Sequence, residues 1–158
     1  MEIDTLFGLP AHPLVVHAAV VLLPIAAIAL VVVAAIPRAR RLYGPIVLGV
    51  AIAATIAVGL AQQSGESLQG DVDKTELVEE HTEQGETVLP WAIGVTVVSA
   101  LVAAEPYTRK RLESLSPRVV TAVLVGASLI VGVGATWTVI EVGHSGATSV
   151  WNDVGDDG

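Results

Sequence analysis

The sequence contains no cysteine, few aromatic residues and few charges. Without cysteine the chain has no disulfide, no thiolate metal site and no thiol nucleophile, so a metal site would have to use imidazole or carboxylate ligands. Aromatic residues make up 4% and charged residues 15% of the 158 residues, whereas 53% are hydrophobic and the mean hydropathy is +0.68. The apolar residues form long uninterrupted runs, which a water-soluble core does not need. The composition therefore predicts one integral membrane domain that spans residues 1–158.

Four apolar runs are long enough to cross a bilayer. The first has no charge and would be about 34 Å long as a helix, against a hydrocarbon core of about 30 Å. Pro13 suits a first helical position with His12 as its cap, and Gly143 reads as a helix stop. The sequence predicts an all-α fold, an antiparallel four-helix membrane bundle. The predicted spans are residues 14–36, 43–62, 88–104 and 119–142.

Seven of the eight Lys and Arg residues lie in two segments, 37–42 and 105–118. The bias of cationic loops toward the cytoplasm predicts that both segments are cytoplasmic. The acidic loop 64–87 and both termini are then expected on the outer side of the cell membrane. The acidity of the outer side has two interpretations, which are adaptation to high salt and a docking face for a basic partner.

Small residues four positions apart predict helix contact faces in lipid. One such series lies in the second span, and a second pair, Ser128 and Gly132, lies in the fourth. The segment before the third span has an amphipathic pattern, with Asp73 as a cap for a helix that starts at Lys74. Gly85 and Pro90 predict a bend between this helix and the span. The series in the second span consists of Gly49, Ala53, Ala57 and Ala61.

The predicted topology places all four histidines at the outer side of the membrane. They are His12, His17, His81 and His144. Two imidazoles on opposite sides of a porphyrin bind haem b, and a helix bundle is a common scaffold for such a site. His17 and His144 are the preferred axial ligands, because both are expected at membrane level. A zinc or copper site would instead use three or four of the histidines, with Glu80 or Glu141 completing the set.

Glu141 is also a candidate to accept a hydrogen bond from the second ring nitrogen of a ligating histidine, which would fix the tautomer of that ring. The three hypotheses for function are therefore a haem-binding electron-transfer module, a zinc or copper protein, and a cofactor-free structural or interaction subunit. The expected partners are the lipid bilayer and a redox protein or membrane complex, with no nucleic acid. The sequence offers no nucleophile with a base and no pair of catalytic carboxylates, which argues against an enzyme.

The segment Gly8 to His17 resembles the opening motif of the membrane protein family known as domain of unknown function 2231, Gly-x-Pro-x-His-Pro-x-x-Val-His. Gly143 and His144 resemble that family's Gly-His motif after the last helix, and His81 matches its histidine before the third helix. The resemblance covers nearly the whole chain and implies a four-helix membrane domain with a matched histidine set. Relatives joined to a Rieske iron-sulfur domain favour electron transfer. The tail from Val150 departs from the family pattern.

Overall fold

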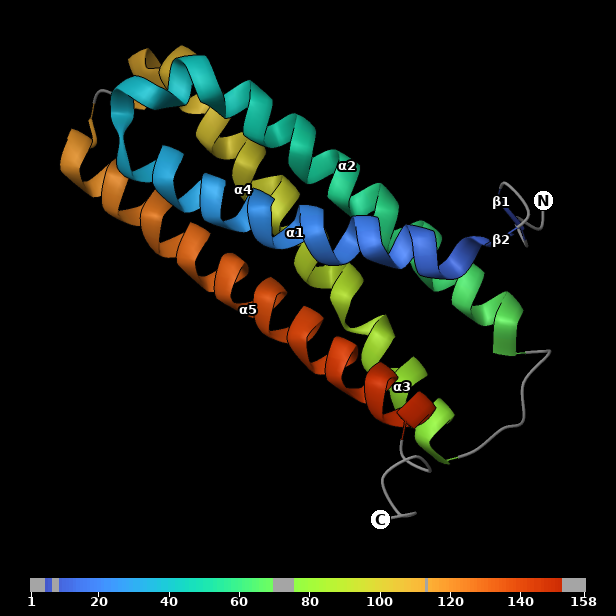
Figure 1. The fold of residues 1–158 in the computed structure, drawn as a ribbon. Helices are drawn as coiled ribbons and strands as arrows, with labels where there is room; N and C mark the ends of the chain where they lie inside the picture. The colour runs from blue at the N-terminus through green and yellow to red at the C-terminus, as the bar shows by residue number, and fades with distance from the viewer. Residues whose placement is uncertain (1–4, 7–8, 70–75, 113, 152–158) are drawn as a thin grey trace.

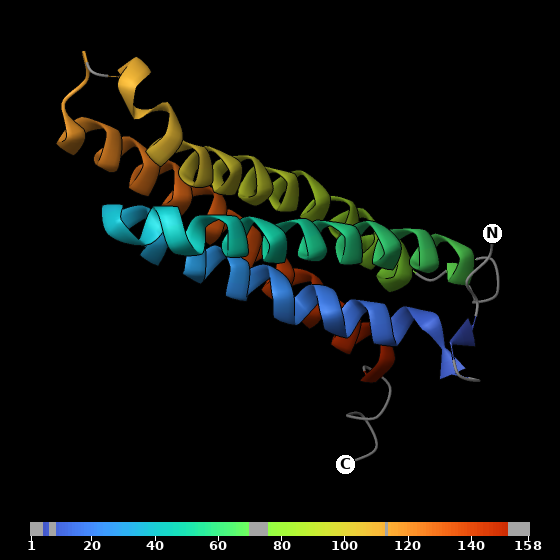
Figure 2. The same ribbon diagram turned by 90° about the horizontal axis from the view of Figure 1, so that it is seen from above.

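A computed structural model describes residues 5–6, 9–69, 76–112 and 114–151. The described chain is mostly helical, with one short antiparallel strand pair in which Thr5 pairs with Pro10 and Leu6 with Leu9. Four helices are long and apolar enough to cross a membrane, and they lie side by side in two perpendicular views (Figures 1 and 2). The elements are β1 (Thr5–Leu6), β2 (Leu9–Pro10), α1 (Ala11–Ala35), α2 (Pro37–Gln69), α3 (Glu76–Glu86), α4 (Val88–Thr108), η1 (Arg109–Leu112) and α5 (Pro117–Trp151).

Each long helix extends beyond the apolar run from which it was predicted. Helix α1 begins at Ala11, so His12 lies in its first turn and not outside the helix as expected. Helix α2 begins at Pro37, so the expected loop 37–42 is helical. Pro37 fits there because a proline in the first turn loses no helical hydrogen bond.

The expected helix stop at Gly143 is wrong, since α5 continues to Trp151. Hydroxyl groups support the extra turns, because the Ser145 side chain donates to the Val142 carbonyl and the Thr148 side chain donates to the His144 carbonyl. A glycine therefore lies within this helix without ending it. Its missing side chain costs only about 1 kcal/mol relative to alanine.

The predicted helix before the third span and the bend that follows it are confirmed. Helix α3 ends at Glu86 and α4 begins at Val88, so the break falls at Thr87, between Gly85 and Pro90. The Thr87 hydroxyl donates to the Gln84 carbonyl over 2.6 Å, which satisfies the end of α3. The expected start at Lys74 and cap at Asp73 lie outside the described residues.

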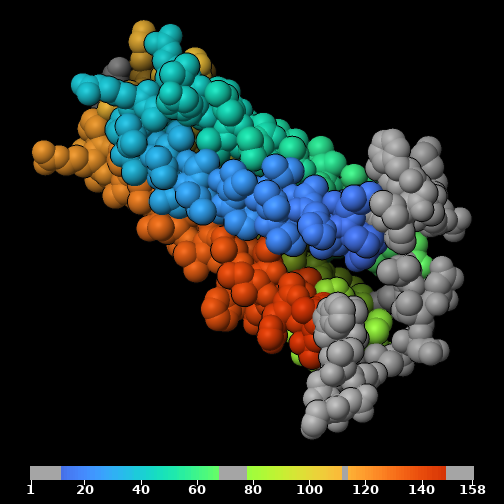
Figure 3. All heavy atoms as spheres, in the orientation of Figure 1, coloured from blue at the N-terminus to red at the C-terminus, as the bar shows by residue number. Residues whose placement is uncertain are grey.

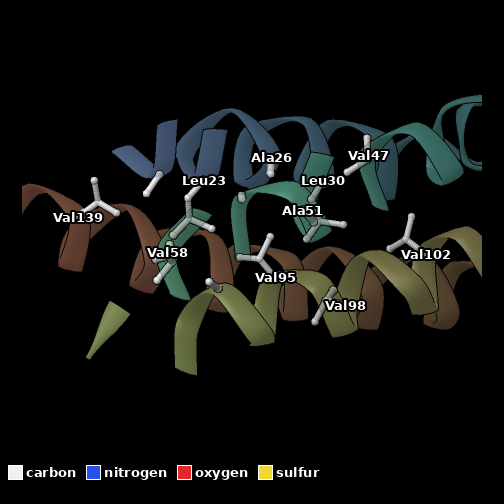
Figure 4. Close-up of a cluster of buried hydrophobic side chains, with 14 of the residues drawn as sticks. Leu23, Ala26, Leu30, Val47, Ala51, Val58, Val95, Val98, Val102 and Val139 are labelled. Carbon is white, nitrogen blue, oxygen red and sulfur yellow. The ribbon is translucent and has the colours of Figure 1, made fainter. Parts of the chain in front are cut away.

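The core of the bundle consists of alanine, valine and leucine from all four long helices (Figure 4). Leu23 and Leu30 of α1, Ala51 of α2 and Val95 of α4 are fully buried. Such small and branched side chains allow helix backbones to approach closely, which is how helices associate in lipid. Figure 3 shows α1 packed between α2 and α5 on the near face of the bundle.

The small-residue prediction is half right. Gly132 lies against Ala27 of α1 and Ser128 is fully buried, as expected for a contact face. In α2, Ala57 is buried as expected, but a Cβ at Gly49 would meet no atom within 4 Å, and Ala53 is exposed. The close contact of α2 instead occurs at Gly44, where a Cβ would lie 2.9 Å from the Cα of a residue in α4, Ala103.

A buried ion pair joins the helices at the end of the bundle where α2 and α5 begin, called the arginine end. Arg40 is 0% exposed and Glu105 of α4 is 5% exposed, and Arg40 Nη1 lies 3.3 Å from Glu105 Oε2. Arg40 Nη2 also donates to the Ala34 carbonyl over 2.6 Å and to Thr121 Oγ1 over 2.8 Å. One side chain therefore contacts the last turn of α1, the last turns of α4 and the first turns of α5. The charge pattern of the sequence had placed this arginine only among the cations of a cytoplasmic loop.

Candidate functional site

The opposite end of the bundle carries two similar histidine sites and is called the histidine end. In the first, His12 of α1 lies beside the last turns of α2. His12 Nδ1 is 3.0 Å from Ser64 Oγ. The next residue, Gly65, gives the imidazole room, because a Cβ there would lie 3.2 Å from His12 Cε1.

The second site repeats this arrangement with residues of α3 and α5. His81 Nδ1 is 3.1 Å from Ser145 Oγ. The glycine after this serine is again in contact with the ring, since a Cβ at Gly146 would lie 2.9 Å from His81 Cε1. Each site is thus a histidine ring that packs on a Ser-Gly pair near the end of a long helix.

The serine hydroxyls determine which ring nitrogen carries the proton. Ser64 Oγ lies 3.0 Å from the Ala61 carbonyl, and Ser145 Oγ lies 3.2 Å from the Val142 carbonyl. A carbonyl can only accept, so each hydroxyl donates its one proton to the backbone and must accept from the imidazole. His12 and His81 therefore donate from Nδ1. In the neutral rings Nε2 then has a free lone pair.

The two sites lie on helices that contact one another. Each ring is partly buried. Gln62 Nε2 of α2 also donates to the Gly85 carbonyl of α3 over 2.8 Å, which joins the helices that carry the two sites. The structure thus brings together two of the four predicted histidines.

The other two histidines are exposed and are not part of this pair. His17 donates from Nδ1 to the Pro13 carbonyl over 2.7 Å, within its own helix. His144 is exposed, and within the described part of the chain its ring has no hydrogen-bond partner. Glu141 is exposed as well. The hydrogen bond to a histidine ring that the sequence assigned to this carboxylate is made instead by Ser64 and Ser145.

Among the described residues, no group of three or more His, Asp or Glu side chains is arranged to hold a metal ion. A protein site for zinc normally uses three or four side-chain ligands. Two imidazoles with free Nε2 atoms match the number of side chains that a haem iron takes as axial ligands.

Residues 8–156 match the family described as predicted membrane protein (DUF2231). The chain belongs to this family. Its four apolar helices agree with that description. No curated protein and no solved structure matches this DUF2231 chain.

The two Ser-Gly pairs in this DUF2231 chain were not among the predicted site residues, although the sequence contains a signal for them. Helices α2 and α5 both open with Pro-Arg, at residues 37–38 and 117–118. Both carry Ser-Gly near the other end, at residues 64–65 and 145–146.

Proposed function

We propose that the protein binds one haem b between His12 and His81 and transfers electrons at the outer face of the membrane. The observation that supports this proposal best is the shared tautomer of the two imidazoles. In both, Nδ1–H is donated to a serine, which leaves Nε2 as the free ligand atom. Haem and metal-ligating histidines usually have such a partner on the second nitrogen, because it orients the ring and raises its basicity.

The surroundings of the two rings are consistent with this role. Each ring packs on a glycine and is partly buried. His12 and His81 would hold the haem through their Nε2 atoms, and the haem would supply one-electron transfer between a reduced and an oxidised partner protein.

The proposal includes the topology of the bundle. His12 at the start of α1 contacts Ser64 near the end of α2, while Arg40 near the start of α2 contacts Ala34 near the end of α1. These contacts support an antiparallel arrangement of the helices. The arginine end carries seven of the eight Lys and Arg residues, which supports a cytoplasmic location for it. Both termini and the histidine end would then face outward.

An absorption spectrum of the detergent-purified chain tests the cofactor, with elemental analysis of the same sample. We expect a Soret band, reduced-minus-oxidised α and β bands after dithionite, and iron near one atom per chain. Zinc or copper at that ratio without porphyrin bands would replace haem with the metal-site hypothesis. A colourless, metal-free protein from cells with ample haem supply would contradict both and favour the cofactor-free subunit.

A further inference from the structure

The surface of the arginine end carries cations that no described acidic residue neutralises. Glu105 is the one acid among the described residues of this end, and it is buried. Both of its oxygens are occupied, Oε2 by Arg40 at 3.3 Å and Oε1 by Arg109 at 3.0 Å. The remaining cations are all exposed, and within the described residues none has an ion pair. They are Arg38, Arg41, Lys110, Arg111 and Arg118.

These five cations, called the basic rim, lie where the helices leave the apolar part of the bundle. Arg38 and Arg41 are three residues apart in the first turns of α2, so they share one helical face. Lys110 and Arg111 are in η1, directly after α4. The rim therefore surrounds the end of the bundle from three separate elements, since Arg118 opens α5.

Two further features at this end match a phospholipid headgroup. Tyr43 and Tyr107 are 50% and 67% exposed, and exposed tyrosines at a helix end favour the interfacial region of a bilayer. Helices α2 and α5 also direct their amino-terminal ends here, where the helix dipole favours an anion. Arginine side chains bind phosphate through paired N–H donors.

We propose that the basic rim binds the headgroups of anionic phospholipids in the leaflet that faces the arginine end. The buried ion pair contributes by removing the one described carboxylate from this surface, so that it does not repel a phosphate. The bound lipids would hold the bundle at a fixed depth in the bilayer. This inference does not depend on a cofactor at the opposite end.

The test counts lipids that bind to the full chain purified in neutral detergent. The protein is incubated with equal amounts of phosphatidylglycerol and phosphatidylcholine, and adducts are counted by native mass spectrometry. We expect phosphatidylglycerol to dominate, and the preference to fall as salt is raised. Each basic-rim cation should contribute about fivefold, so Lys110→Gln with Arg111→Gln should lower the preference about 25-fold.

Two further variants make the result decisive. Arg38→Gln with Arg41→Gln should give a similar loss from a different helix, with folding checked by circular dichroism. Lys74 is the one Lys or Arg residue outside segments 37–42 and 105–118. Lys74→Gln should therefore leave the preference for phosphatidylglycerol unchanged. Equal binding of the two lipids to the unmodified chain would overturn the proposal and assign the cations to an acidic protein partner. An unchanged preference in both double variants would overturn it as well.

Discussion

Replacing Arg40 with methionine should destabilise the bundle more than any substitution on its surface. The guanidinium is fully buried and donates to the Ala34 carbonyl from both Nε, at 3.2 Å, and Nη2, at 2.6 Å. That carbonyl is in the last turn of α1, where it has no partner within the helix. Methionine would leave this carbonyl unsatisfied and would leave Glu105 buried, with only the half-exposed Arg109 as its partner. Removing one member of a buried ion pair costs about 3–5 kcal/mol.

The free energy of unfolding can be measured by titrating the protein from mild detergent into sodium dodecyl sulfate. Arg41→Met is the matched control, because Arg41 is the exposed neighbour of Arg40 and its loss should change stability by less than about 0.5 kcal/mol. Glu105→Leu alone should be strongly destabilising, since it leaves the buried guanidinium without its carboxylate. The double variant Arg40→Met with Glu105→Leu should recover the part of the loss that comes from the unpaired buried charge, because replacing both partners by apolar groups is often nearly neutral, while the Ala34 carbonyl stays unsatisfied. Equal stability of Arg40→Met and Arg41→Met would refute the reasoning.

Two smaller perturbations test the packing of the histidine site and of the bundle interior. Gly146→Ala places a Cβ 2.9 Å from His81 Cε1, so it should displace the ring and lower the melting temperature in detergent. At Gly143 a Cβ would meet no atom within 4 Å, so Gly143→Ala should be neutral or stabilise the helix by up to about 1 kcal/mol. Similar melting temperatures for the two variants would contradict the contact. Thr55→Val removes the 2.8 Å bond between Thr55 and Thr96 across α2 and α4, and the same detergent titration should show a loss of about 0.6–1.7 kcal/mol. No loss would mean that the hydroxyl adds nothing to helix association.

The four long helices could be predicted because each contains an apolar run that is visible in the sequence alone. The break at Thr87 was also predictable, since Gly85 and Pro90 are local signals. The ends of the helices were less predictable. The polar last turns of α5 continue the helix where the Ser145 hydroxyl donates to the Val142 carbonyl and accepts from His81 of α3. Such contacts join residues far apart in sequence, so they cannot be predicted from the hydropathy of a single segment.

The pairing of side chains was the least predictable part of the structure. Charge pattern placed Arg40 in a solvated loop, whereas the turn at Ile36 directs it back into the bundle against Glu105. The charge pattern predicted all four histidines at one end of the bundle, but it could not tell that His12 and His81 each bind a serine of a neighbouring helix. Only the packed helices decide which rings find such a partner and which face outward.

Haem content in single histidine variants tests the central claim most directly. His12→Ala and His81→Ala are compared with His17→Ala and His144→Ala, which remove exposed imidazoles outside the pair. All four are expressed with the same haem supply, and the reduced-minus-oxidised bands are measured per mole of chain. The account predicts that the first two variants lose or shift the bands and the last two retain them. Loss of the bands in His17→Ala or His144→Ala, with His12→Ala and His81→Ala unchanged, would contradict it.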